Sequence, residues 1–293
     1  MLTFNLPFFF EAQSHSKNLI CPEKYPFHLY YDKKFNLFRQ KGTLYQKKLL
    51  DKIYSKGSVL TGSLGDNSGK YKTDIILEKL FSVTNKLIGR KVLEIGCGSG
   101  SLLKILSKKG AFCYGIEPGI QLKKITNKNI KIVKDFFPSQ KLHLKFDLII
   151  HFNVLEHIEN PFIILKKQLE YLNPNGLIFF GVPDCKPYIN YGDISFFNHE
   201  HYNYFTKESI KKKFYLLKKE IIFIEEYPEL GMILSAIKNT NFTEKSKKIK
   251  TIDSEINIRQ LEFFKNKVKG FTKKIKSFLS DYNPNEIAIY CPV

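Results

Sequence analysis

The sequence predicts an α/β fold built on a doubly wound sheet of seven strands. An apolar segment at 91–95 predicts a buried strand, which runs through glycines at every second position into a helical pattern at 101–106. Strands and helices then alternate as far as residue 183, which is typical of a parallel sheet. Two adjacent strand patterns, 220–226 and 232–238, share a short Pro/Gly turn and predict an antiparallel pair that completes the sheet.

The other elements of this domain follow from apolar periodicity. A helix at about 72–86 carries apolar residues at three-to-four spacing and leads into the first strand. A helix at 161–172 precedes the last parallel strand, and Asn173–Gly176 predicts the turn between them. The predicted parallel strands are 91–95, 112–116, 130–133, 146–152 and 177–183.

The chain divides into three predicted parts. Residues 1–70 are irregular and rich in aromatic residues, and we expect a metal-free N-terminal cap containing an aromatic hairpin at 29–38. Residues 71–240 form the α/β domain. Residues 241–293 form an extension in which a charged helical region precedes a final strand pattern at 285–291. The stretch Gly57–Gly69 is predicted to be a loop or linker.

The composition narrows the class of protein. The formal net charge of +19 suggests nucleic-acid binding as one possibility. The lysines are, however, spread along the chain, so we favour the interpretation that they reflect a general compositional bias. Some of this positive charge would attract a phosphorylated small-molecule substrate. The five cysteines include no Cys-x-x-Cys pair, so neither a zinc knuckle nor a disulfide framework is indicated. No apolar run has membrane-spanning length and no convincing signal peptide is present, so we expect a cytoplasmic protein.

The glycine-rich turn predicts a cofactor cradle. Gly96, Gly98 and Gly100 let the backbone turn sharply and let a ligand approach without a Cβ in the way. Glu94, at the end of the preceding strand, can accept hydrogen bonds from an amine or cation. The pattern Glu-x-Gly-x-Gly-x-Gly differs from the dinucleotide fingerprint and from the P-loop. A merely structural turn is the alternative interpretation.

Three further strand ends offer cofactor contacts. Glu117 follows the second strand about 20 residues after the glycines, where a carboxylate holds ribose hydroxyls in such folds. Asp135 and Phe136 follow the third strand and can meet an adenine amine and ring, although Phe136 can equally be a core residue. Asn153 opens the loop after the fourth strand.

These motifs together resemble the class I S-adenosylmethionine-dependent methyltransferases. The first motif of that family has the form seen at 94–100, and its fourth-strand loop resembles Asn153–Pro161. The resemblance implies a Rossmann-like seven-stranded sheet and S-adenosyl-L-methionine as the cofactor. Methyl transfer to oxygen or carbon requires an acceptor held in line and a group that removes a proton.

Histidines supply the candidate bases. His157 follows the fourth strand, and His199-Glu200-His201 lies among aromatic residues after the fifth. A Glu beside a His can orient the imidazole and raise its basicity. Three interpretations stay open for the triplet: catalysis or substrate binding, capping or core packing near a helix that starts at Thr206, and metal binding. We favour the first and predict no metal, because no further ligand pair lies nearby in sequence.

The run His199–Phe205 is similar to the sugar C-methyltransferases, which act on nucleotide-linked deoxysugars. The resemblance covers about residues 70–240 and implies that Glu200, His201 and His157 are catalytic, with Asn198, His199 and Tyr204 at the substrate. Asn198 stands where the family has a Tyr. The resemblance further implies that the family's N-terminal zinc ribbon is degenerate here, with Lys24 in place of a ligand after Cys21. It also implies that the family's second nucleotide-fold module would begin at Ile287 and is cut short.

We therefore expect a methyltransferase for a sugar, nucleotide-sugar or cell-surface polysaccharide precursor. Carbon methylation needs a strong base and an oxyanion partner, whereas oxygen methylation needs one base, so O-transfer is slightly favoured. A nucleic-acid methyltransferase is the alternative, but the chain has no Asn/Asp-Pro-Pro-Tyr tetrad and no Pro-Cys pair. A non-catalytic scaffold is the third reading. A homodimer stays open.

Overall fold

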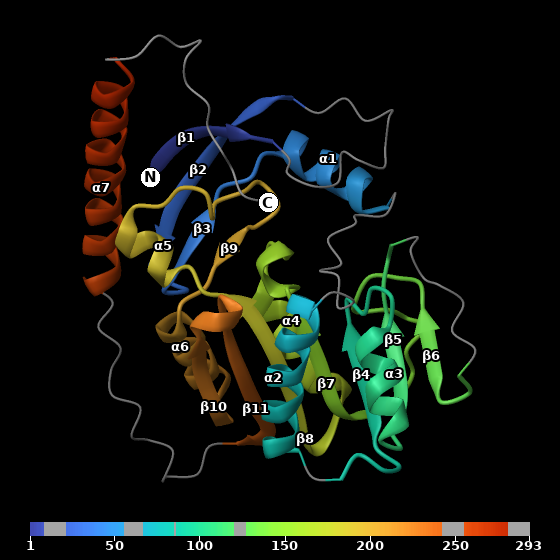
Figure 1. The fold of residues 1–293 in the computed structure, drawn as a ribbon. Helices are drawn as coiled ribbons and strands as arrows, with labels where there is room; N and C mark the ends of the chain where they lie inside the picture. Colours follow the sequence, from blue (N-terminus) through green and yellow to red (C-terminus); the bar gives the residue numbers. More distant parts are fainter. Residues whose placement is uncertain (9–21, 56–66, 85, 120–126, 242–254, 281–293) are drawn as a thin grey trace.

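The computed structural model shows two sheets in contact (Figure 1). The lower one in this view is the predicted seven-stranded sheet, with the strand order β10-β11-β8-β7-β4-β5-β6. The structure describes residues 1–8, 22–55, 67–84, 86–119, 127–241 and 255–280.

The large sheet has five parallel strands and an antiparallel end, as predicted. The parallel strands are β4 (Lys91–Ile95), β5 (Phe112–Ile116), β6 (Ile130–Val133), β7 (Phe146–Phe152) and β8 (Leu172–Pro183). The antiparallel strands are β11 (Met232–Asn241) and β10 (Lys219–Tyr227). The central strand β7 is apolar on both faces because helices cover both sides.

Within the part of the chain that the structure describes, four helices enclose this sheet. One face packs against α2 (Asn67–Val83) and α3 (Ser101–Lys108), which supply Leu80 and Leu103 to the core. The other face packs against α4 (Pro161–Tyr171) and α6 (Lys207–Leu217), which supply Leu165 and Phe214. Helix α6 begins where its capping signal predicts, since Thr206 Oγ1 accepts a hydrogen bond from the Ser209 N–H.

Two boundaries differ from the sequence prediction. Helix α2 spans Asn67–Val83 rather than 72–86, so it begins inside the predicted loop Gly57–Gly69. Strand β8 begins at Leu172 because the predicted turn Asn173–Gly176 is incorporated as an irregularity in the strand. Asn175 has φ 60 there, and the register against β7 shifts between Phe146 and Leu148.

The second sheet has the order β1-β2-β3-β9. Strands β1 (Leu2–Pro7), β2 (Lys24–Asp32) and β3 (Leu37–Gln40) come from the N-terminal region and include the predicted aromatic hairpin. The two-residue strand β9 (Asn203–Tyr204) comes from the segment after β8 and pairs with β3. This pairing joins the N-terminal sheet to the α/β domain.

Helices also flank the second sheet, three of them among the described residues. Helix α1 (Leu44–Ser55) follows β3, while α5 (Lys186–Tyr191) and α7 (Glu255–Leu279) pack together at one side (Figure 1). Phe264 of α7 is fully buried against Phe4 and Phe197. Within the described ranges no helix is long and apolar enough to cross a membrane. The degenerate knuckle at Cys21 and the strand pattern at 285–291 lie outside the described residues.

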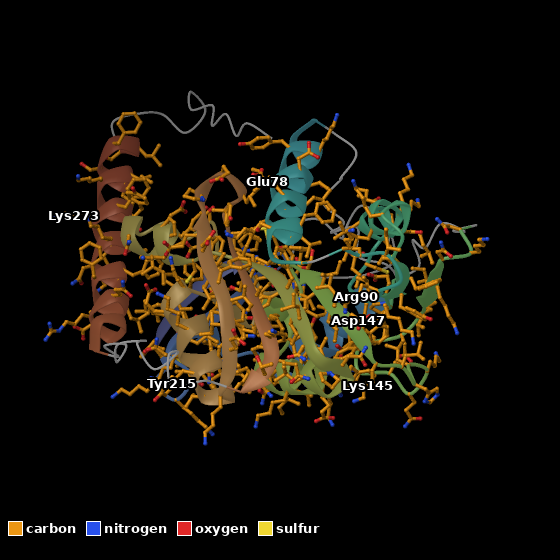
Figure 2. All side chains as sticks on the ribbon, turned by 90° about the horizontal axis from the view of Figure 1, so that it is seen from below. Glu78, Arg90, Lys145, Asp147, Tyr215 and Lys273 are labelled. Atoms are coloured by element: carbon orange, nitrogen blue, oxygen red, sulfur yellow. The ribbon has the colours of Figure 1, made fainter. Side chains whose placement is uncertain are left out.

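Charged side chains line the outside of both parts (Figure 2). Asp147, at the amino end of β7, accepts hydrogen bonds from the Lys91 N–H and from Asn173 Nδ2, each at 2.9 Å. Arg90 Nη1 lies 3.7 Å from the same carboxylate. Asp147 thus ties β4 and β8 to β7 at the amino ends of the strands. In open α/β sheets ligands bind at the opposite, carboxyl ends of the strands.

Candidate active site

The glycine-rich turn has the conformation that a cofactor cradle requires. Gly96, Gly98 and Gly100 have φ of 70, 48 and 70, in the left-handed region that favours glycine. A Cβ built on Gly96 would lie 2.8 Å from Val154 Cγ2, in the loop after β7. The turn is therefore restricted to glycine at a position where it touches the neighbouring loop.

Two glutamates face this turn. Burial, and then the charge of Glu117, raise the pKa of Glu94 well above its usual value, and Glu94 Oε2 has no hydrogen-bond partner among the described residues. Glu117 accepts hydrogen bonds from the Gly98 N–H at 3.0 Å and the Gly119 N–H at 2.8 Å. A buried acceptor without a donor beside an open glycine turn fits a ligand that brings an amine or hydroxyl group.

The other predicted cofactor residues lie at the same edge. Asp135 is held by its own loop, because it accepts hydrogen bonds from the Phe136 N–H at 2.9 Å and Ser139 Oγ at 2.8 Å. The Phe136 side chain is 57% exposed, so it is not a core residue. Asn153 is exposed and has φ 53, and its N–H donates to the Gly181 carbonyl at 3.1 Å.

The structure brings His157 and His201 together. Their ring centroids are 4.7 Å apart and the rings meet edge to face. His157 lies in the short helix η2 (Leu155–His157) after β7, and His201 lies in the segment between α5 and β9. The Tyr202 N–H donates to the Glu156 carbonyl at 2.7 Å, and Asn203 Nδ2 donates to the Ile158 carbonyl at 2.6 Å. These bonds fix the two segments against each other.

Burial disfavours the protonated, charged form of both imidazoles. Burial lowers the pKa of His157 to about 4, and burial together with the neighbouring His157 lowers the pKa of His201 well below its usual value. His157 Nδ1 lies 3.2 Å from the Glu200 carbonyl oxygen. Because a carbonyl only accepts, Nδ1 carries the proton and the lone pair of His157 is on Nε2.

The predicted substrate residues divide into two groups. Asn198 lies beside His201: its Oδ1 accepts hydrogen bonds from the backbone N–H groups of Glu200 and His201 at 3.0 Å, and its Nδ2 is 3.3 Å from His201 Nδ1. The other group, His199 and Tyr204, is buried toward the second sheet.

In this second group, the ring nitrogens of His199 lie 3.1 Å from the carbonyl oxygens of Pro7 and Tyr25. Tyr204 Oη donates to the Asn198 carbonyl at 2.9 Å. These two side chains therefore position the loop and do not line an open surface. Glu200 is buried as well, with 4% of its surface exposed.

Two residues that the sequence analysis did not single out belong to this site. Glu156 is 1% exposed, burial raises its pKa to about 8, and its Oε1 lies 3.9 Å from His157 Nε2. Asn203 joins the two histidine-bearing segments through its side-chain amide. The signal for Glu156 was its place beside His157 in a loop that follows a buried strand; Asn203 gives no local signal, because its partners lie far away in sequence.

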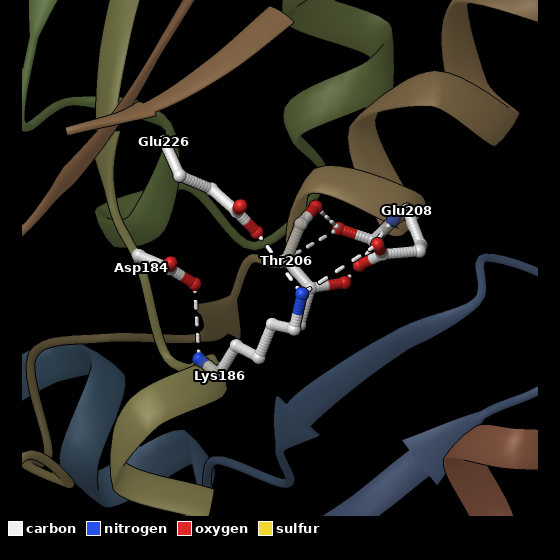
Figure 3. Close-up of polar contacts among 6 residues, drawn as sticks. Asp184, Lys186, Thr206, Glu208 and Glu226 are labelled. Atoms are coloured by element: carbon white, nitrogen blue, oxygen red, sulfur yellow. Dashed lines mark hydrogen bonds and ion pairs between the residues drawn. The ribbon is translucent and has the colours of Figure 1, made fainter. Parts of the chain in front are cut away.

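A charged cluster occupies the end of β8 (Figure 3). Lys186 Nζ lies 3.2 Å from Glu226 and 3.9 Å from Glu208, and its backbone N–H donates to Asp184. Burial raises the pKa of Asp184 to about 6. The three carboxylates around Lys186 outweigh its single positive charge, so this cluster is a poor site for a phosphate group. Lys186, the first residue of α5, ties that helix to β10 and α6.

Comparison with known proteins identifies the part of the chain that carries most of the seven-stranded sheet. A family model described as a methyltransferase domain matches residues 69–215, about half of the chain. The chain belongs to this family. Residues 69–215 are an S-adenosyl-L-methionine-dependent methyltransferase domain, and both the α/β fold and the cofactor expected from the glycine motif are confirmed.

Curated relatives of this methyltransferase include O-methyltransferases. The ubiquinone biosynthesis O-methyltransferase of Actinobacillus pleuropneumoniae is 29% identical over 133 residues, which cover 39% of this chain and 57% of the relative. That of Pasteurella multocida is 31% identical over 114 residues, covering 33% and 47%. The chain thus spans about half the length of the curated relatives it matches.

Solved structures share the fold at low sequence identity. The methyltransferase in the Trm112 activator complex of Haloferax volcanii has a TM-score of 0.51 and 12% identity, covering 62% of this chain and 95% of that one. The N-methyltransferase NodS of Bradyrhizobium japonicum, in complex with S-adenosyl-L-homocysteine, has a TM-score of 0.50 and 14% identity, covering 67% and 99%.

Proposed function

We propose that this methyltransferase transfers a methyl group to a hydroxyl oxygen of a sugar, either nucleotide-linked or part of a cell-surface polysaccharide precursor. The observation that carries the proposal is the contact between His157 and His201, in a loop region whose Val154 lies against Gly96 of the cofactor turn. Support for a sugar acceptor comes from the resemblance of His199–Phe205 to the sugar C-methyltransferases.

Bound S-adenosyl-L-methionine supplies an activated methyl group on a sulfonium. In this proposal Gly96, Gly98 and Gly100 admit it to the end of β4, while Glu94 and Glu117 accept hydrogen bonds from its polar groups. Asp135, Phe136 and Asn153 border the same edge and complete the proposed cofactor site. Such fixed partners place the donor before the acceptor arrives.

The proposed acceptor side is the surface next to His157 and His201. An acceptor hydroxyl placed there can give its proton to the histidine pair as its oxygen is methylated. Oxygen transfer is favoured over carbon transfer because Asn198, which replaces the family's Tyr, is engaged in holding its own loop. The choice of oxygen agrees with the curated relatives, which are O-methyltransferases of ubiquinone biosynthesis.

The test is methylation by the purified chain of residues 1–293. We would incubate it with methyl-labelled S-adenosyl-L-methionine and a panel of nucleotide-linked sugars, with phenolic ubiquinone precursors and RNA as competing classes. Mass spectrometry identifies the methylated class and NMR the methylated atom. We expect label on a sugar oxygen, and we expect His157→Ala and His201→Ala each to lower kcat by about 100-fold or more while S-adenosyl-L-homocysteine still binds.

Each other outcome decides against part of the proposal. Label on a phenol or on RNA overturns the sugar acceptor, and label on carbon overturns O-transfer. Unchanged turnover in both histidine variants removes the proposed role of the pair.

A further inference from the structure

We propose that Glu156, His157 and His201 bind one divalent transition-metal ion of the Zn²⁺ type. Each residue offers one ligand atom, and these atoms lie within 4.8 Å of one another. The role of the ion in catalysis rests on the proposed function, because the site lies on the acceptor side. Binding of the ion by these three residues can be tested separately.

The ligand types and their spacing suit such an ion. Two imidazoles and one carboxylate form a set that holds Zn²⁺ in enzymes and leaves at least one position open. Metal–ligand distances of about 2.0–2.1 Å place neighbouring ligand atoms about 3.4 Å apart in a tetrahedral site. Glu156 Oε1 and His157 Nε2 are already 3.9 Å apart, so small side-chain rotations close the site.

The burial of Glu156 is an independent observation that points to a cation. Its side chain is 1% exposed, and neither carboxyl oxygen has a hydrogen-bond partner among the described residues. An acid held out of water without a partner is costly. A metal ion between Glu156 and the two rings supplies the missing partner and allows the carboxylate to be charged.

The surroundings of His157 have the arrangement found around metal ligands. The Nδ1–H of this ring faces the Glu200 carbonyl, which leaves the Nε2 lone pair on the side of Glu156. Asn198 holds His201 in place, because its Nδ2 donates to His201 Nδ1 at 3.3 Å and its Oδ1 accepts a hydrogen bond from the His201 backbone N–H at 3.0 Å. The backbone bond from Tyr202 to Glu156 holds the two ligand-bearing segments together.

The open positions of such a site have a use in the proposed reaction. Two neighbouring hydroxyls of a sugar can both bind one cation, which fixes the orientation of the acceptor. A hydroxyl bound to a cation loses its proton more readily, and water at the site can accept that proton. The histidine pair would then assist the acceptor through the bound ion.

The experiment measures metal binding by the untagged, full-length chain after its metals have been stripped with a chelator. Zn²⁺ is titrated by calorimetry and by thermal shift, with Mg²⁺ as the oxygen-preferring comparison. We expect one Zn²⁺ per chain, a saturable rise in Tm and no comparable effect of Mg²⁺. Glu156→Gln is expected to weaken Zn²⁺ binding at least tenfold, whereas the control Glu159→Gln, on the exposed part of the same loop, leaves it unchanged.

S-adenosyl-L-homocysteine binding, measured on the same samples, separates this inference from the proposed function. Normal cofactor binding with no Zn²⁺ uptake, or equal Zn²⁺ affinity in Glu156→Gln and the wild type, overturns the metal site and leaves the methyltransferase proposal standing. Saturable Zn²⁺ binding that depends on Glu156 supports the site even if no sugar is methylated.

Discussion

Single buried residues in this protein take their properties from their neighbours. Lys213 of α6 is 4% exposed, and its Nζ lies 3.5 Å from the ring centroid of Phe35 and 3.7 Å from that of Phe162. The rings attract the ammonium through their π faces, but burial is the larger effect and lowers the pKa of Lys213 to about 7. The side chain therefore links a hairpin residue to α4 at a cost in solvation.

This lowered pKa predicts a pH-dependent stability. A lysine with a folded pKa of about 7 and an unfolded pKa of 10.5 binds its proton more weakly in the folded protein. With respect to this lysine, the folded protein is therefore most stable above pH 10.5, where the lysine is neutral in both states, and it loses free energy of unfolding as the pH falls toward 7. From pH 7 to 9 the free energy of unfolding of the wild type should rise, relative to Lys213→Met, by about 1 kcal/mol per pH unit. Urea unfolding at each pH measures it.

The control for this prediction is Lys212→Met, which replaces the preceding, half-buried lysine. The free energy of unfolding of this variant should change with pH in the same way as that of the wild type. Parallel pH curves for Lys213→Met and the wild type would show that Lys213 titrates normally in the folded protein.

At the scale of elements, the strand–turn–helix unit of β4, the glycine turn and α3 makes the cofactor site. Helix α3 follows Gly100, whose left-handed conformation precedes the first helical turn and needs no side-chain cap. At Gly96 a Cβ would lie 2.8 Å from Val154 Cγ2, a side chain of another loop. This close approach places the cofactor turn against the loop that carries His157.

Gly96→Ala therefore has two costs, a strained φ and a contact of 2.8 Å with Val154 Cγ2. We expect at least a tenfold loss of S-adenosyl-L-homocysteine affinity by calorimetry and a loss of stability in urea. The matched control is Gly89→Ala. Gly89 has φ 75, but a Cβ added there would have no neighbour within 4 Å among the described residues. This variant therefore has the backbone strain of about 1–2 kcal/mol without a steric clash. Equal effects of the two changes would rule out the contact with Val154.

At the scale of the whole molecule, the second sheet is joined to the α/β domain through the segment after β8. Strand β9 completes the N-terminal sheet, and His199 of the same segment lies between the carbonyls of Pro7 and Tyr25. Helix α7 closes the outer side of this unit through Phe264, which contacts Phe4 of β1 and Phe197. The loop that carries His201 is thus held in place by both parts.

Phe264→Ala is expected to destabilise this unit by about 3–5 kcal/mol, because a fully buried ring is lost from a packed cluster. Hydrogen exchange should show loss of protection in β1, β2 and α7 before β4 and β7. Phe271→Ala, on an exposed part of the same helix, should change stability by less than about 0.5 kcal/mol. A uniform loss of protection across both sheets would contradict a separately held N-terminal unit.

Much of the fold could be predicted because its signals are local. The apolar strand before Gly96, the glycines themselves and the Thr206 cap each act over a few residues, and the structure has β4, the turn and α6 where these signals predict them. The strand predicted to start at Leu177 begins at Leu172 in the structure, because Leu172 already pairs with Phe146 of β7 ahead of the irregular stretch Asn173–Gly176. Pairing between strands depends on partners that no local pattern specifies.

The amino-acid sequence by itself determined the sheet, its cofactor turn and the acids at the strand ends, since hydrophobic periodicity and glycine's conformational freedom operate within single elements. Only the tertiary structure decided that His157 and His201 meet with Glu156 beside them, and that His199, in the same triplet, turns away into the N-terminal sheet. The physical reason is that burial and contact between distant loops are set by how whole elements pack, and residue spacing carries no record of that packing.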